Sequence, residues 1–404
     1  MSEDKRDFNQ GQPKEAIGVL AQPSRDTGGT FHYTQALIEA LGRYSKFKER
    51  LLILKNDAFD LKLKDNGFRC IPFNVRPTTF FEKLSRLLLI SLPSMKFLEN
   101  VHQDYQAFAH RPMRLLINPI VSLSVVFSKT PFITIIHDFQ DRYYPQYFKF
   151  QDRLRRKLVN KCLAQGALFI VCESDCVKKD ILKFLKVPEQ KIRVIVSPPP
   201  SYLRACDVLE EFLRTIQHKY ELPKEYLFYP AQFWPHKNHI RLVKSLAYLK
   251  EKYQIKIPLV LVGSSLDHFE NVRCEINKSN LQEQIKYLGY VSDEEIVCLY
   301  KLAKALIVPS LFESMSLPVW EALSWGLPVL ASKVCALPEQ IGRAGIIFDP
   351  FSTEDMGEKI YQVWMDRSLR EKLIGYGFAR IKTLTLEHYA QQWDEVIEQS
   401  LCVN

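Results

Sequence analysis

The feature that most constrains the fold is the stretch from residue 305 to residue 350, in which short apolar runs alternate with segments typical of helices. Ala305–Val308 has the pattern of a buried strand, and Pro328–Ala331 and the residues around Ile346 repeat it. Between the first two runs a helix is expected to begin near Pro318, because proline is tolerated in the first helical turn. Strands that alternate with helices predict a parallel α/β sheet.

The loop before that helix holds the candidate chemistry. Ser316 is the expected N-cap, so Met315, Ser316 and Leu317 should present free backbone N–H groups and the positive end of the helix. Open α/β sheets bind ligands in the crevice above the strand ends, which is where these amides should point. Glu313 and Glu321 flank the loop with seven residues between them. The stretch therefore predicts a ligand-binding loop at residues 313–317.

These residues resemble the donor-site signature of the retaining glycosyltransferases of family 4. The resemblance implies a GT-B fold, in which two Rossmann-like parallel-sheet domains face each other across a cleft. It also implies a nucleotide diphosphate sugar as co-substrate and no cofactor. A pair of glutamates alone would be weak evidence, but the whole motif appears in order over residues 305–350. The matching segments are Pro309-Ser310, Glu313, Glu321, Gly326-Leu327-Pro328-Val329 and Leu337-Pro338-Glu339.

The length of 404 residues fits two domains better than one. The proline run Pro198–Pro200 is typical of a rigid connector after a strand, so we expect the boundary shortly after it. The resemblance implies that residues 1–205 form an N-terminal, acceptor-side Rossmann-like domain and that residues 206–384 form a Rossmann-like domain that binds the nucleotide-sugar donor. By the resemblance, residues 385–404 form a C-terminal helix that crosses back to the first domain.

Composition favours a cytoplasmic protein. No apolar run reaches the roughly eighteen residues of a membrane span, and the first residues are polar and charged, unlike a signal peptide. Nine cysteines without a CxxC pair favour reduced thiols. No nucleic-acid partner is expected.

In the first half, the candidate site residues follow strand-like runs. Gly28 and Gly29 follow the run Ile17–Ala21 and would let the backbone approach a phosphate or a sugar, although a simple turn explains them equally well. His137 ends the run PFITIIHD, where a parallel strand meets its ligands, although a lone histidine is more often structural. The segment HDFQDRYYPQYF resembles the family's His-Asp segment. This resemblance implies that His137 contacts the donor sugar and that Asp138 orients it.

In the second half, Lys237 precedes a predicted amphipathic helix, where its ammonium can add to the positive helix end around a diphosphate. A solvated side chain is the alternative, but the position matches a lysine of the family. Gln232 stands where the family has an arginine, so one cationic phosphate contact is absent, and His236 is expected to replace it in part. Gly263 follows the predicted strand Pro258–Val262 in a turn expected near the nucleotide.

Glycosyl transfer builds negative charge on the leaving diphosphate, so the site must stabilise phosphate more than it needs a strong base. The resemblance implies that Glu313 bonds the donor sugar, that Glu321 bonds the ribose, and that the leaving phosphate takes the acceptor proton. Glu313 could equally be a hydrolase nucleophile, with Asp138 as the remaining candidate for its acid partner. No acidic pair of the DxD type stands in a convincing context, so we expect metal independence. Residues 314–316 read Ser-Met-Ser where the family often has Gly-Phe-Gly, which should restrict the loop.

The net charge of +9 is unevenly distributed. Residues 1–205 hold 33 Lys and Arg against 20 Asp and Glu, a net charge of +13. Residues 206–404 hold the other 22 Lys and Arg against 26 Asp and Glu, a net charge of −4. The basic stretch 152–166 contributes to this excess. It predicts either a solvated surface or a peripheral contact with an anionic membrane at its inner face.

Three functions stay open on the sequence. The segments HDFQDRYYPQYF and YPAQFWPHKNH resemble mannosyltransferases of cell-surface glycans, which favours transfer of a hexose, mannose first, to a saccharide or lipid-linked saccharide. A nucleotide-sugar epimerase of the same architecture is the second hypothesis. A non-catalytic protein that binds sugar nucleotides is the third.

Overall fold

The computed structural model describes residues 15–22, 28–56, 59, 68–73, 113–128, 130–203, 209–266 and 268–403. The chain divides into two compact units. Unit 1 comprises Met1–Glu173, Val177–Ser197 and Leu386–Asn404, and unit 2 comprises Ser174–Cys176 and Pro198–Thr385. The main chain thus passes into unit 2 at Pro198, whereas the boundary expected after residue 205 lies outside the described residues.

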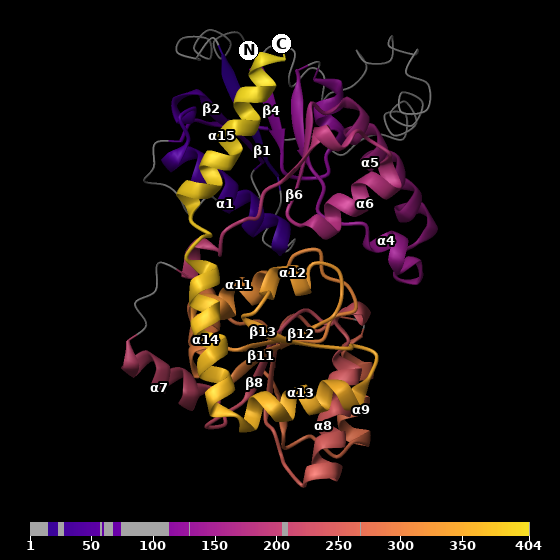
Figure 1. Ribbon diagram of the computed structural model, residues 1–404, viewed down its shortest axis with the longest axis vertical. Helices are drawn as coiled ribbons and strands as arrows, with labels where there is room; N and C mark the ends of the chain where they lie inside the picture. Colours follow the sequence, from indigo (N-terminus) through magenta and orange to yellow (C-terminus); the bar gives the residue numbers. More distant parts are fainter. Residues whose placement is uncertain are drawn as a thin grey trace, which may run out of the picture. The chain divides into compact units, whose positions relative to one another are not determined.

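Unit 1 is built on a seven-stranded sheet in the order β3-β2-β1-β4-β5-β6-β7 (Figure 1). All neighbouring strands are parallel, as the alternating pattern predicted. The strands are β1 (Ala16–Ala21), β2 (Leu51–Lys55), β3 (Cys70–Pro72), β4 (Met113–Asn118), β5 (Phe132–Ile135), β6 (Phe169–Cys172) and β7 (Ile192–Val194).

Helices cover this sheet, and the C-terminal helix is one of them. Tyr389, Trp393 and Ile397 of this helix are buried in the same core as α1 and the strands β1 and β4. The Asp394 carboxylate accepts hydrogen bonds from Ser45 Oγ at 2.5 Å and from the Lys46 amide at 2.9 Å, just beyond the end of α1. The helices are α1 (Gly29–Tyr44), α4 (Gln140–Tyr143), α5 (Phe150–Gly166), α6 (Asp175–Leu185, mostly in unit 1) and α15 (Leu386–Cys402), with short 3-10 turns at Lys48–Arg50, Leu123–Phe127, Pro145–Tyr147 and Glu189–Lys191.

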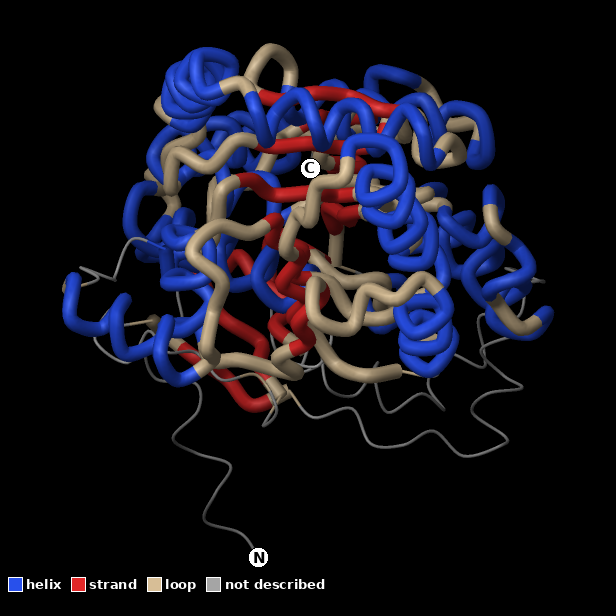
Figure 2. Tube along the Cα trace, turned by 90° about the horizontal axis from the view of Figure 1, so that it is seen from below, coloured by secondary structure: helices blue, strands red, loops and turns tan. Residues whose placement is uncertain are grey.

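Unit 2 is built on a six-stranded parallel sheet in the order β10-β9-β8-β11-β12-β13. Figure 2 shows strands in red with helices in blue around them. The strands are β8 (Leu227–Pro230), β9 (Leu259–Val262), β10 (Ile285–Tyr287), β11 (Ala305–Val308), β12 (Val329–Ser332) and β13 (Gly345–Phe348). The helices are α7 (Glu210–Lys219), α8 (His239–Tyr253), α9 (Phe269–Lys278), α10 (Asp293–Leu302), α11 (Leu317–Ser324), α12 (Leu337–Ile341), α13 (Thr353–Met365) and α14 (Arg367–Ile381), with 3-10 turns at Ser201–Leu203 and Pro235–Lys237.

The strand order of unit 2 reverses between β8 and β11. Chain connections leave these neighbours toward opposite sides of the sheet, and this is where open α/β sheets bind ligands. Both strands are buried, since Leu227 and Ile307 have no exposed surface. Two parallel Rossmann-like sheets confirm the predicted fold class. No helix among the described residues has the length and apolarity needed to cross a membrane.

Candidate functional site

The loops after β8 and β11 bring two predicted site residues into contact. Lys237 Nζ lies 2.5 Å from Glu313 Oε1, and Ser310 Oγ donates a hydrogen bond to the same oxygen at 2.8 Å. Glu313 is only 9% exposed, and the lysine pairs with its buried carboxylate. Glu313 Oε2 has no partner within the described part of the chain. This oxygen is therefore available to a ligand.

Asn238 holds the two loops together. Its backbone has a φ of 61°, in the left-handed region that asparagine tolerates better than most residues. Its Nδ2 donates to the carbonyl oxygens of Pro309 at 2.9 Å and Pro350 at 3.0 Å. The Leu311 amide also donates to the His236 carbonyl at 2.7 Å. These bonds fix the spacing of Lys237 and Glu313.

The start of α11 differs in detail from the expectation. Ser316 is the N-cap residue, and Pro318 lies in the first turn as predicted, but the Ser316 side chain makes no capping hydrogen bond. Instead Gln340 accepts from the Ser316 amide at 3.0 Å and donates to the Ser316 carbonyl at 2.7 Å. The Met315 and Leu317 amides have no partner in the described ranges. Two of the three expected amides therefore remain for an anionic ligand.

Glu321 is already occupied by the protein itself. Its Oε1 accepts a hydrogen bond from the Tyr202 hydroxyl, and its Oε2 accepts one from the Tyr300 hydroxyl. Burial raises the pKa of this carboxyl group, while the two hydroxyls oppose that shift. A ribose bound to Glu321 would have to share the carboxylate with a tyrosine or displace one. Sequence reasoning missed both tyrosines, which lie 119 and 21 residues from Glu321 along the chain.

Gly263 and Gln232 lie beside the end of β8. Gly263 has a φ of 145°, and a Cβ at this position would lie 2.4 Å from the Ala231 carbonyl oxygen, so only glycine fits. Gln232 is exposed, and its Oε1 accepts from Trp234 Nε1 at 2.9 Å. Burial and the nearby Lys237 lower the pKa of His236 to about 3, which keeps it neutral near pH 7. A neutral His236 can offer a phosphate an N–H donor but no charge, and its partial replacement of the missing cation stays a prediction.

In unit 1, His137 follows β5 and is bonded at both ring nitrogens. Nδ1 lies 3.4 Å from Glu173 Oε2, and Nε2 lies 2.9 Å from the Pro119 carbonyl oxygen. Both partners accept hydrogen bonds, so a ring protonated at both nitrogens fits them best. Burial works to lower the pKa of His137, but Glu173 and the Pro119 carbonyl outweigh it and the pKa is raised.

The carboxylate that faces His137 is Glu173, so the expectation that Asp138 orients the ring was wrong. Asp138 Oδ1 instead accepts from the Gln140 amide at 2.9 Å and from Arg156 Nη2 at 2.6 Å. Glu173 directly follows β6, the neighbour of β5 in the sheet. Because neighbouring parallel strands end at the same edge of a sheet, the position of Glu173 just after a predicted strand could have placed it near His137.

Gly28 and Gly29 also belong to unit 1, where Gly28 is the N-cap of α1. Its φ of 57° favours glycine, although a Cβ at either position would meet nothing within 4 Å. Residues 23–27 of the same loop lie outside the described residues. Among the described residues, no cluster of three or more His, Cys, Asp or Glu side chains could hold a metal ion. Metal independence stays a prediction.

Known proteins share sequence with this chain. Residues 214–380 match the family model described as "Glycosyl transferases group 1". The "O-antigen chain mannosyltransferase B" of Escherichia coli is 30% identical over 264 residues, which cover 64% of this chain and 68% of that protein. The "Serotype-specific mannosyltransferase WbdA" of Escherichia coli is 24% identical over 216 residues, 53% of this chain but only 26% of that protein.

A solved structure shows the same fold. The crystal structure of Anabaena Alr3699/HepE in complex with UDP and glucose superposes with a TM-score of 0.71 at 16% sequence identity. The match covers 95% of this chain and 99% of that one. This likeness confirms the expected GT-B fold.

Proposed function

Since the chain belongs to the group 1 glycosyltransferases, we propose that it is a retaining, metal-independent hexosyltransferase that moves mannose from a nucleotide diphosphate sugar to a saccharide or lipid-linked saccharide. The observation that carries the proposal is the contact between Lys237 and Glu313 beside the start of α11. The names of the two Escherichia coli relatives support mannose as the sugar and cell-surface glycan synthesis as the process.

The charges of this cluster suit a departing diphosphate. The Lys237 ammonium and the amides of Met315 and Leu317 supply positive charge and N–H donors at the end of β11 and the start of α11. Glu313 positions Lys237 through Oε1 and keeps Oε2 for a hydroxyl of the donor sugar. In this proposal the leaving phosphate takes the acceptor proton on the same face, which retains the configuration at the anomeric carbon.

The proposal is tested in two steps. A thermal-shift screen over GDP-, UDP- and ADP-sugars should raise the melting temperature with one nucleotide, because a ligand that binds only the native state stabilises it. The sugar nucleotide selected should then yield an α-linked product on mannose-containing acceptors, as ¹H NMR of the anomeric proton reports, with equal rates in EDTA.

Other outcomes identify other functions. Interconversion of the free nucleotide sugar would indicate the epimerase, and binding without turnover would indicate the non-catalytic protein. An inverted product, or a loss of activity in EDTA that Mg²⁺ restores, would contradict the retaining or the metal-independent part of the proposal.

A further inference from the structure

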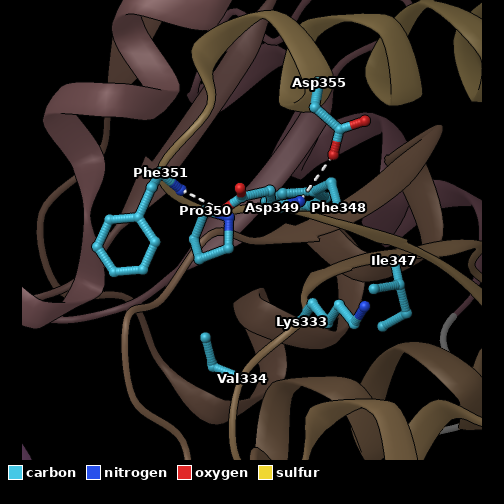
Figure 3. Close-up of a pocket in the computed structure, with 8 residues that line it drawn as sticks. All are labelled: Lys333, Val334, Ile347, Phe348, Asp349, Pro350, Phe351 and Asp355. Atoms are coloured by element: carbon cyan, nitrogen blue, oxygen red, sulfur yellow. Dashed lines mark hydrogen bonds between the residues drawn. The ribbon is translucent and has the colours of Figure 1, made fainter.

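A hollow of about 570 Å³ lies in unit 2 at the carboxyl ends of β12 and β13 (Figure 3). Lys333 and Val334 follow β12, Asp349 and Phe351 follow β13, and Asp355 lies in the first turn of α13. The volume falls in the range of small-molecule sites. The side chains of Lys237 and Glu313 are not part of its wall.

An aromatic ring forms one side of the hollow. Phe351 is 58% exposed, and in Figure 3 its ring lies beside Pro350, away from Ile347. The Arg241 guanidinium lies 5.4 Å from the centre of the ring. The Phe351 amide donates to Asp349 Oδ1 at 2.9 Å, which fixes the backbone that carries the ring. The π face of such a ring is negative and attracts C–H groups.

The charged groups of the hollow are of both signs. Lys333 Nζ has no hydrogen-bond or ion-pair partner within the described residues. Asp355 Oδ2 accepts from the Asp349 amide at 2.7 Å, so each aspartate is held by one backbone bond and keeps lone pairs for a ligand. The two carboxylates would repel a strongly anionic ligand, and Lys333 would repel a cationic one. A neutral ligand with many hydroxyls can donate to the aspartates and accept from the lysine.

The hollow is also connected to the candidate transfer site. Asn238 bonds both the Pro309 carbonyl, at the start of the Glu313 loop, and the Pro350 carbonyl, in the wall of the hollow. The Ala336 amide, two residues after Val334, donates to the Glu313 carbonyl at 3.1 Å. The same loops therefore shape both places.

We propose that this hollow binds a neutral hexose unit of the acceptor saccharide. The C–H face of the sugar ring would stack on Phe351, while its hydroxyls bond Asp349, Asp355 and Lys333. The acceptor role rests on the proposed function, whereas saccharide binding at this place does not. A subsite of this kind would favour acceptors with more than one sugar.

The test measures the binding of two saccharides, methyl α-D-mannopyranoside and an α-linked mannotetraose, to the full chain. Saturation-transfer NMR detects the binding. Phe351→Ala should weaken the binding of the tetrasaccharide by about threefold to tenfold, the scale of one aromatic contact, and Lys333→Ala should weaken it by a similar factor, the scale of one hydrogen bond. Tyr376→Ala is the matched control, since Tyr376 is 39% exposed in unit 2 and also carries a guanidinium over its ring, that of Arg343 at 4.5 Å. This control should bind as the wild type does.

The same samples are titrated with the nucleotide sugar that raises the melting temperature. Its affinity should be equal in all four proteins, and it should not displace the tetrasaccharide. No tetrasaccharide binding by the wild type, equal binding by Phe351→Ala, or displacement by the nucleotide sugar would overturn the subsite. Failure of every nucleotide sugar to bind would contradict the proposed function instead, and the tetrasaccharide titration would still decide the subsite.

Discussion

Lys237 and Glu313 form an ion pair whose side chains are only 21% and 11% exposed. Breaking such a pair leaves the other charge uncompensated, so the variants must be chosen to keep the fold. Glu313→Gln retains an acceptor for Ser310 Oγ and most of the side-chain volume. Glu313→Ala would instead leave a cavity beside Lys237 and remove its acceptor. A loss of transfer activity in Glu313→Gln would therefore report the role of the carboxylate in catalysis, because this variant should keep the fold.

Lys237→Ala should weaken the binding of the nucleotide sugar more than Gln232→Ala does. Only the lysine carries charge for the diphosphate, and losing a charge-assisted hydrogen bond costs on the order of 1.5–3 kcal/mol. Gln232, whose Oε1 accepts from Trp234 Nε1 at 2.9 Å, is the matched control from the same loop. Titration calorimetry measures both affinities. Equal small losses would remove Lys237 from the phosphate site.

Tyr202→Phe should tighten the binding of the nucleotide sugar. If Glu321 bonds the ribose, the Tyr202 hydroxyl competes for Glu321 Oε1, and removing it frees that oxygen. The gain should be about threefold to tenfold, the scale of one hydrogen bond. Tyr300→Phe is the comparison, because Tyr300 is 1% exposed and its loss should lower the melting temperature instead. Weaker binding by Tyr202→Phe would mean that this hydroxyl serves the ligand.

At the scale of elements, α15 is attached to unit 1 through Asp394, which is 8% exposed. Asp394→Ala leaves the buried Ser45 hydroxyl without its acceptor, which costs about 1–3 kcal/mol, and also removes the part-buried bond from the Lys46 amide. Urea unfolding followed by tryptophan fluorescence reports the loss, since Trp393 is buried in the same core. Glu398→Ala removes an exposed ion pair with the same Lys46 and should change stability little. Equal effects of the two variants would show that α15 is held by apolar packing alone.

The elements were predictable where local pattern determines them. Ala305–Val308 is a strand with the predicted bounds, because four apolar residues between turns are long enough for a buried strand and too few for an ordinary helix. Ser292 caps α10 in a capping box, a pattern that can be seen in the sequence because Glu295 lies three residues after Ser292. Contacts between distant segments were not predictable. Gln340 bonds the Ser316 backbone, and Glu173 rather than Asp138 faces His137, because the fold brings these distant residues together.

At the scale of the whole molecule, the basic excess of the first half gathers partly on α5. Arg156 is not free for a partner, because it bonds Asp138 at 2.6 Å and Asp141 at 3.0 Å. Lys157 and Lys161 are exposed, and they continue a stripe with Phe150, 73% exposed, and Leu154, 44% exposed. Positions i, i+4, i+7 and i+11 share one helix face. Exposed apolar side chains beside lysines suit the interface of an anionic membrane.

The α5 stripe should therefore hold the protein at anionic vesicles in low salt and release it in high salt. Each nearby lysine contributes roughly 1 kcal/mol, screened within about 8 Å at physiological ionic strength. Lys157→Glu with Lys161→Glu should then weaken co-sedimentation by on the order of thirtyfold, and Phe150→Ser should weaken it even in low salt, where the charges are intact. The control reverses two exposed lysines of unit 2, Lys244→Glu with Lys278→Glu, which changes the net charge equally. If both double variants lose binding alike, only the net charge matters and α5 is not the contact. If the wild type does not bind phosphatidylglycerol vesicles in low salt, the predicted membrane contact is wrong, and a soluble acceptor is favoured.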